Sequence, residues 1–127
     1  MSEDLPSPEN AVRPLPSDAI ELRWTRTNMK PHRRFVEVAR RFIKRVGFPV
    51  VLSKPFGQET PSHQCGTIRF GADPGQAALD PFCKAYDHDN LYVVDASFFP
   101  SSGAVNPALT IMANALRVGD HLAARLG

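Results

Sequence analysis

The chain has 127 residues, a formal net charge of +2, 43% hydrophobic residues and 22% charged residues. This length suits one small domain or a piece of a larger one, and the composition is too apolar for a disordered chain. No apolar run reaches about 18 residues, which excludes a membrane-spanning helix.

The N-terminal part of the chain predicts a loop, a short strand and one helix. Four prolines in residues 1–19 favour a loop with short edge strands, because proline cannot donate to a sheet or continue a helix. Residues 20–24 alternate apolar and polar side chains, which is the period of a strand. A helix is expected over about 31–46, with Asn28 as its cap and Gly47 at its end. Its apolar face, expected to be core, carries Phe35, Val38, Ala39, Phe42, Ile43 and Val46.

This predicted helix lies in a strongly basic segment. Nine Lys or Arg residues and a single acid, Glu37, lie between Arg23 and Arg45, whereas the rest of the chain has six basic and twelve acidic residues. Such a segment suits phosphate groups or an acidic partner. It equally suits the solvated side of an amphipathic helix. A non-catalytic module that contacts nucleic acid or an acidic partner is therefore the alternative interpretation.

The C-terminal part predicts two short strands and a second helix. Residues 49–53 and 91–94 are short apolar runs that favour strands. Residues 71–90 are rich in glycine, proline and polar side chains, and they predict a long surface excursion. A helix is expected to start at Asn106 and Pro107, since asparagine is a strong cap and proline is tolerated in a first turn. Few charges follow, so we expect this helix to be mostly buried.

Three places carry side chains suited to chemistry. HQCGT at 63–67 contains His63. Asp95 follows the predicted strand 91–94, and the carboxyl end of a strand is where open α/β sheets usually contact ligands. VNPALT at 105–110 opens a helix whose first N–H groups have no partner within the helix. Taken singly, each place has a plainer interpretation: an ordinary histidine, a capping aspartate and a common helix start.

Taken together, these motifs resemble the C-terminal segment of the glucose–methanol–choline (GMC) family of flavin-dependent oxidoreductases. The resemblance lies in LPSPENAV at 5–12, HQCGT at 63–67, DP at 73–74, NLYVVDASFFPSSGAVNPALT at 90–110 and ANALRVGDHL at 113–122. It implies an α+β fold without the N-terminal Rossmann unit. Residues 1–60 would complete the substrate-domain sheet. Residues 61–127 would carry the catalytic histidine loop and return a strand and a long helix to the FAD domain.

The resemblance also implies a reaction, in which a small-molecule alcohol gives its hydroxyl proton to a base and a hydride to N5 of FAD. His63 matches the catalytic base, and imidazole suits this role because it titrates near neutral pH. Asn106 matches the second active-site position, where an amide can hydrogen-bond the substrate oxygen but cannot titrate. The positions that match the cofactor-binding residues are Asp95, Ala96, Asn106, Pro107, Ala108 and Leu109. The free N–H groups of the last two would stabilise the reduced flavin.

The FAD domain of this family begins with a strand–GxGxxG–helix unit, and none of the eight glycines here is spaced G-x-G. We therefore expect a truncated chain that is inactive alone and exposes apolar surface. A split enzyme with an N-terminal FAD-binding half on another chain, or a remnant with another role, are the alternatives. Which alcohol is oxidised, and whether by an oxidase or a dehydrogenase, stays open.

The remaining expectations concern metal, cysteines and location. A zinc site from His63, Cys65 and Cys83 has no supporting spacing, so we expect no metal. The two cysteines suit free, buried or half-buried thiols in a reducing compartment. The first ten residues (MSEDLPSPEN) lack the basic start of a signal peptide. We expect a cytoplasmic protein that binds neither nucleic acid nor membrane.

Overall fold

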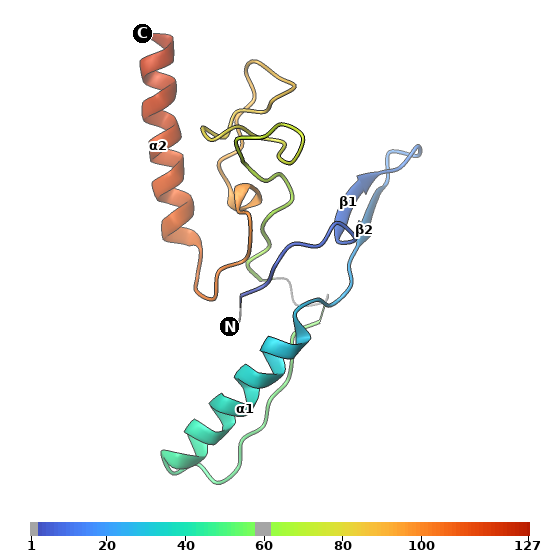
Figure 1. Cartoon of the computed structure of the whole chain (residues 1–127), viewed down its shortest axis with the longest axis vertical. Helices are drawn as coiled ribbons and strands as arrows, with labels where there is room; N and C mark the ends of the chain where they lie inside the picture. Colours follow the sequence, from blue (N-terminus) through green and yellow to red (C-terminus); the bar gives the residue numbers. More distant parts are fainter. Residues whose placement is uncertain (1–2, 58–61) are drawn as a thin grey trace.

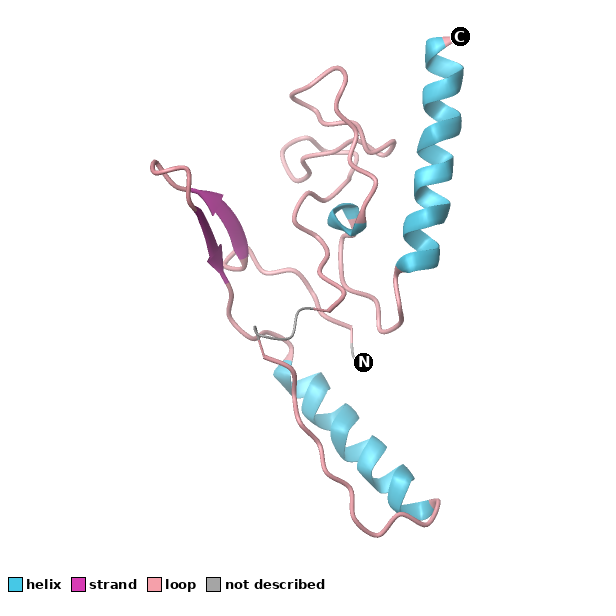
Figure 2. Cartoon of the chain, turned by 180° about the vertical axis from the view of Figure 1, so that it is seen from behind, coloured by secondary structure: helices cyan, strands magenta, loops and turns pink. Residues whose placement is uncertain are grey.

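The computed structural model describes residues 3–57 and 62–127, and few of them lie in regular elements (Figure 1). A hairpin of β1 (Ala11–Pro14) and β2 (Ile20–Arg23) is followed by α1 (Met29–Arg45), and α2 (Ala108–Leu126) comes at the end of the chain. Much of the chain between α1 and α2 is irregular, as the pink trace in Figure 2 shows. The predicted boundary between residues 60 and 61 lies outside the described residues.

The hairpin confirms the predicted strand at 20–24 and the short edge strand expected within residues 1–19. Its strands are antiparallel, with Ala11 opposite Arg23 and Pro14 opposite Ile20. Proline is tolerated at the end of this two-stranded ribbon because it ends the ladder. The base of the hairpin is closed by Asn10, whose side chain accepts from the Thr25 N–H at 2.7 Å and donates to the Thr25 carbonyl at 3.0 Å.

Helix α1 begins two residues and ends one residue earlier than predicted. Its end is a Schellman motif, in which the Phe48 N–H donates to the Ile43 carbonyl and the Gly47 N–H to the Lys44 carbonyl. Gly47 has a φ of +106°, a conformation that favours glycine. Asn28 occupies the N-cap position as predicted, but its side chain does not cap the helix. Its amide donates instead to the carboxylate of Asp4.

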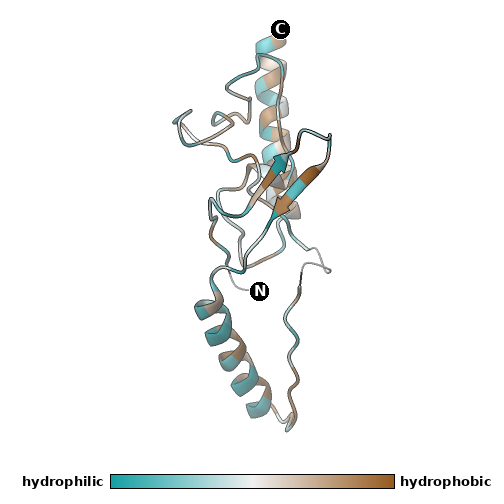
Figure 3. Cartoon of the chain, turned by 90° about the vertical axis from the view of Figure 1, so that its right-hand side faces the viewer, coloured by the Kyte–Doolittle hydropathy of each residue, from teal (hydrophilic) through white to brown (hydrophobic). Residues whose placement is uncertain are grey.

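The apolar face of α1 is not buried within this chain, so the expectation that it forms core was wrong for the described residues. Phe35 is 45% exposed and Phe42 is 64% exposed, because no other element among the described residues covers them. Hydrophilic and hydrophobic bands alternate along the helix (Figure 3). The basic side chains of α1 are exposed, as on a solvated face. A hollow of about 340 Å³, lined in part by Arg33, Arg40 and Lys54, lies between α1 and residues 53–55, where Arg40 donates to the Ser53 hydroxyl at 2.8 Å.

The core lies in the segment that the sequence predicted to be a surface excursion, so that prediction was wrong. Leu79 and Cys83 are fully buried and Ala85 is 8% exposed; together with Phe98 and Val118 they form the core of the described residues. The polar residues that suggested a loop act as turn formers here. Asp80 accepts from the Phe82 N–H at 2.8 Å and the Lys84 N–H at 3.0 Å, and this turn directs its apolar neighbours inward.

Neither predicted strand of the C-terminal part forms. Residues 91–94 make a single bridge, Lys84 to Tyr92, flanked by the bonds Ala85 N–H to Leu91 carbonyl and Val93 N–H to Cys83 carbonyl. Their backbone groups therefore pair with a neighbouring turn, which satisfies them locally. Residues 49–53 are irregular and expose Val50 and Leu52, because the described part of the chain offers no strand for them to pair with.

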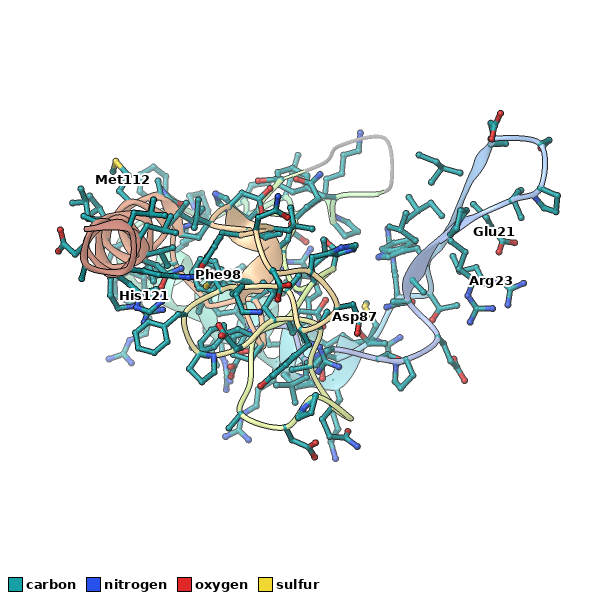
Figure 4. All side chains as sticks on the ribbon, turned by 90° about the horizontal axis from the view of Figure 1, so that it is seen from above. Glu21, Arg23, Asp87, Phe98, Met112 and His121 are labelled. Atoms are coloured by element: carbon teal, nitrogen blue, oxygen red, sulfur yellow. The ribbon has the colours of Figure 1, made fainter. Side chains whose placement is uncertain are left out.

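Helix α2 confirms the long C-terminal helix. The prediction that this helix is mostly buried was wrong for the described residues. Only Val118 is buried, while Leu109 and Leu116 are 78% and 73% exposed. Figure 4 shows Phe98 beside α2, on the core side of the helix. The small number of charged residues in α2 does not by itself predict burial, because an apolar side chain is buried only where another surface covers it.

Side-chain contacts hold α2 against residues 81–92. Arg117 donates to the Pro81 carbonyl at 2.7 Å, and Arg125 donates to the Tyr92 hydroxyl. His121, predicted to lie on the polar side of the helix, instead stacks on the Phe82 ring with centroids 4.0 Å apart.

The described residues expose 22 large hydrophobic side chains and bury five apolar residues, which confirms the expected exposure of apolar surface. Helices and a small sheet together agree with the predicted α+β class. No helix in the described part of the chain combines the length and apolarity needed to cross a membrane.

Candidate functional site

His63 lies at the start of residues 63–70, the histidine turn, which lead into the core segment. Its backbone has a φ of +58°, a left-handed conformation that few non-glycine residues adopt. Its side chain is half-buried. Gly66 follows with a φ of +79°, and a Cβ there would lie 3.2 Å from the Phe99 carbonyl oxygen. Glycine at 66 therefore allows the histidine turn to approach the chain near Phe99 closely.

The histidine turn is joined to the predicted cofactor-binding segment by three backbone hydrogen bonds. The N–H groups of residues 66, 68 and 70 donate to the carbonyls of residues 96, 97 and 98 at 3.3, 3.1 and 3.3 Å. Ala96–Phe98 forms the 3₁₀ turn η1. Two of the three predicted places, around His63 and around Asp95, are thus adjacent in space although about 30 residues separate them.

The third predicted place, residues 105–110 at the start of α2, lies next to the histidine turn, and the two share a small hollow. His63, Cys65, Phe99, Ser102, Val105 and Pro107 are among the residues that line it. Its volume is about 10 Å³, room for roughly one water molecule. Asn106 stands between two lining residues, but it is exposed and its own side chain does not line the hollow. The structure therefore brings the backbone at Asn106 to His63, and does not bring the two side chains to one cavity.

The start of α2 differs by one residue from the prediction. Pro107, not Asn106, is the N-cap, and its carbonyl accepts the first helical bond from the Ile111 N–H at 3.0 Å. No side chain caps this helix. Ala108 and Leu109 are exposed and belong to the first turn, whose N–H groups have no acceptor within the helix. The helix N-terminus thus presents donors and the positive end of the helix dipole beside the hollow.

Asp95 holds the η1 turn. Its carboxylate accepts from the Ser97 N–H at 2.8 Å and caps the turn. Hydrogen bonds from Ser97 lower the pKa of Asp95 below its usual value, since they stabilise the charged form. The carboxylate is exposed. Of the two roles open to this residue, contact with a ligand and fixation of the loop, the geometry displays the second.

Replacing Asp95 with alanine is expected to destabilise the turn by about 0.5–1 kcal/mol at neutral pH, at the low end of a capping interaction because the group is exposed. A lowered pKa means that the stabilisation is present above the pKa of the unfolded chain and is lost as pH falls through the folded value. Amide exchange of Ser97, followed from pH 7 to pH 3, measures both effects. A difference between variant and parent that persists undiminished at pH 3 would contradict this assignment.

Five lining residues were not among the predicted site residues: Cys65, Phe99, Ser102, Gly103 and Val105. All of them lie within the motifs at 63–67 and 90–110, but only the pairing of residues 66–70 with 96–98 brings Cys65 to the others. Burial raises the pKa of the Cys65 thiol, a hydrogen bond from Ser102 opposes this, and the charge of Asp4 adds to it. Cys65 is therefore a neutral thiol at pH 7. Cys65 and Cys83 are both free, as predicted.

In the part of the chain that the structure describes, no three His, Cys, Asp or Glu side chains are arranged to hold a metal ion.

Comparison with known proteins identifies relatives of this chain. A sequence profile described as GMC oxidoreductase, for the C-terminal domain, matches residues 6–115. The chain is 34% identical to 2-methyl-1,2-propanediol dehydrogenase of Mycolicibacterium austroafricanum, over 97% of its own length. It is 39% identical over 66% of its length to 6'''-hydroxyparomomycin C oxidase of Streptomyces lividus. It is 33% identical over 65% of its length to a long-chain-alcohol oxidase of Arabidopsis thaliana.

The chain spans only part of these relatives. It covers 24% of the dehydrogenase, 16% of the paromomycin-type oxidase and 11% of the plant oxidase.

Proposed function

Because the chain belongs to the GMC oxidoreductase family, we propose that it is the C-terminal catalytic segment of an FAD-dependent oxidoreductase acting on CH–OH groups. The relatives support the reaction class, since they include 2-methyl-1,2-propanediol dehydrogenase, 6'''-hydroxyparomomycin C oxidase and a long-chain-alcohol oxidase. We propose a small-molecule alcohol as substrate. Residues 1–60 would belong to the substrate domain and residues 61–127 would complete the site.

One observation carries this proposal: the turn of His63 and the start of α2 share one hollow. A reacting hydroxyl group placed there would meet an imidazole from one side and the donors of the helix N-terminus from the other. The left-handed backbone of His63 adds support, because unfavourable backbone conformations persist mainly where a function requires them. Two segments more than 40 residues apart are needed to build this arrangement.

In the proposed reaction His63 accepts the hydroxyl proton of the alcohol. Asn106 donates a hydrogen bond to the substrate oxygen; this requires its exposed side chain to turn toward the hollow from its position beside Val105 and Pro107. The N–H groups of Ala108 and Leu109 stabilise negative charge that develops near the start of α2. FAD, when bound, supplies the hydride acceptor.

The residues present fit one half of that cofactor. The first turn of α2 has no side-chain cap, so its donors are available to an anionic group, and the reduced isoalloxazine ring is anionic. The amide of Ala96 and the carboxylate of Asp95 offer further polar groups on the adjoining turn. Nothing in the sequence matches the glycine-rich motif that holds the ADP half. That half would be bound by another part of the enzyme, on this or a second chain.

The 127-residue chain alone is expected to bind no FAD and to oxidise no alcohol, because half of the cofactor site is supplied elsewhere. The chain is dialysed against FAD and then washed extensively, and the flavin absorbance at 450 nm measures how much FAD stays bound. A stoichiometric yellow complex would refute it. Free riboflavin serves as a control, since it has no ADP half and reports weak binding of the ring alone.

A chimera tests the function itself. The chain replaces the matching C-terminal part of 2-methyl-1,2-propanediol dehydrogenase, with which it aligns over nearly its whole length. We expect a soluble flavoprotein that reduces a dye in the presence of a short diol. A chimera that holds FAD stoichiometrically but reduces no dye with a panel of primary and secondary alcohols would refute the proposal.

A further inference from the structure

Three segments that are far apart in the sequence converge on Asp4. Its backbone forms an antiparallel bridge with Ser102, with the Asp4 N–H to Ser102 carbonyl at 3.1 Å and the Ser102 N–H to Asp4 carbonyl at 2.9 Å. Its carboxylate accepts from the Thr27 hydroxyl at 3.0 Å and from the side-chain amide of Asn28. One residue thus contacts the start of α1 and the loop that leads to α2.

The bond to Asn28 explains why α1 starts as it does. Asparagine normally caps a helix by accepting from its first turn, but the amide of Asn28 is directed to Asp4 and its backbone is left-handed, with a φ of +52°. The Asn28 side chain therefore connects two segments of the chain and does not cap α1. The start of α1 is therefore fixed to residues 3–5 by charge-assisted bonds, which are stronger than neutral ones.

The bridge to Ser102 leads to the hollow. Ser102 and Cys65 both line it, and the Ser102 side chain lowers the pKa of the Cys65 thiol against the larger effect of burial. The adjoining residue gives a second tie, since the Ser101 hydroxyl donates to the Glu3 carboxylate at 3.1 Å. Four residues after Ser102 comes Asn106. The loop that carries Asn106 is thus anchored at one end by Asp4 and at the other by α2.

We propose that Asp4 is a positioning residue for the hollow: it ties the start of α1 to the loop before Asn106 and places one negative charge near Cys65. The role of the hollow as a reaction site rests on the proposed function. The connection that Asp4 makes between segments, and the effect of its charge on Cys65, do not depend on that function. Asp4 itself is not among the residues that line the hollow, so its proposed role is to position others.

The tie is tested by amide exchange on the 127-residue chain. Asp4→Ala removes both carboxylate contacts, which frees residues 3–5, and the Ser102 N–H is expected to exchange about tenfold faster. Thr27→Val removes one contact and is expected to give a smaller acceleration. The double variant should exchange no faster than Asp4→Ala alone. Glu9→Ala, which removes another carboxylate of the same segment, is the control.

The charge is tested by alkylation of Cys65 with iodoacetamide, resolved from Cys83 by peptide mass spectrometry. Asp4→Asn keeps an acceptor for Thr27 and Asn28 but removes the charge. Loss of a nearby negative charge favours the thiolate, so alkylation at pH 8 is expected to be about two- to fourfold faster. Unchanged alkylation in Asp4→Asn, or unchanged Ser102 exchange in Asp4→Ala, would overturn the proposal. Neither readout needs FAD or alcohol, so failure of the proposed function would leave both results standing.

Discussion

Replacing His63 with alanine in the chimera is expected to slow alcohol oxidation by about 10²–10⁴-fold and to leave FAD bound, because a positioned proton acceptor contributes a factor of that size. The prediction follows from the half-buried imidazole at the hollow shared with the start of α2. We expect the cofactor to be retained because the contacts proposed for it lie on the Ala96 turn and on α2, not on His63. Turnover with a dye and the flavin spectrum of the same sample give both quantities.

Two further variants separate loss of the base from loss of structure. His63 has a left-handed backbone, which alanine tolerates poorly and asparagine tolerates better. His63→Asn therefore keeps the turn and should still lose the same factor. His88→Ala removes an exposed histidine from another loop and should change turnover less than twofold. Turnover within a few-fold of the parent in His63→Asn would remove His63 from the role of proton acceptor.

Replacing Leu79 with alanine is expected to destabilise the fold around the site by about 2–5 kcal/mol. Leu79 is fully buried, so the change removes buried methyl groups and leaves a cavity. The backbone of Leu79 is also where the core segments meet, with bridges to Phe70 and Ala85. Because only five apolar residues are buried in the described part of the chain, a loss of this size is a large share of the net stability of a small domain. Urea unfolding followed by circular dichroism measures it.

A leucine of the same chain provides the matched control. Leu116 lies on α2 and is 73% exposed, so Leu116→Ala removes the same atoms from a site where little area is buried. Its effect on the free energy of unfolding is expected to stay within about 0.5 kcal/mol. Equal effects of the two substitutions would show that Leu79 does not belong to the core and that the core assigned around it is wrong.

The exposed apolar faces of α1 and α2 have a common physical explanation within the proposed function. Both helices carry apolar side chains that stay largely exposed among the described residues, such as Phe42 on α1 and Leu116 on α2. The chain covers at most about a quarter of the relatives compared above. We propose that these faces pack against the rest of the enzyme, and the chimera would then bury them. A gain in solubility of the chimera over the isolated chain is the expected consequence.

Local patterns predicted those elements that local interactions stabilise. Helix α1 has an apolar period of 3.6 and a glycine that completes a Schellman motif, and both signals lie within a few residues of each other. The β2 strand alternates apolar and polar side chains, and the proline of VNPALT marks the start of α2 to within one residue. The family was also predicted from the sequence, because its motifs are runs of adjacent residues.

Other features were decided by contacts between distant segments. Residues 71–90 have the composition of a loop, yet they hold most of the core, because the turns at Asp73 and Asp80 fold them back onto Phe98 and Val118. Residues 91–94 have the composition of a strand, yet they pair with a neighbouring turn. Burial of the helix faces was predicted from composition and did not occur, since burial depends on a partner surface and not on the residue alone.

The sequence by itself determined the family, the two helices, the hairpin strand and His63 as the proposed proton acceptor, since adjacent residues suffice for each of these. Only the tertiary structure placed Cys65, Phe99 and Ser102 around the hollow and joined Asp4 to the start of α1. The physical reason is the same in each case: three backbone bonds between residues 66–70 and 96–98, and one bridge between Asp4 and Ser102, close loops of very different length, and no local pattern encodes such closures.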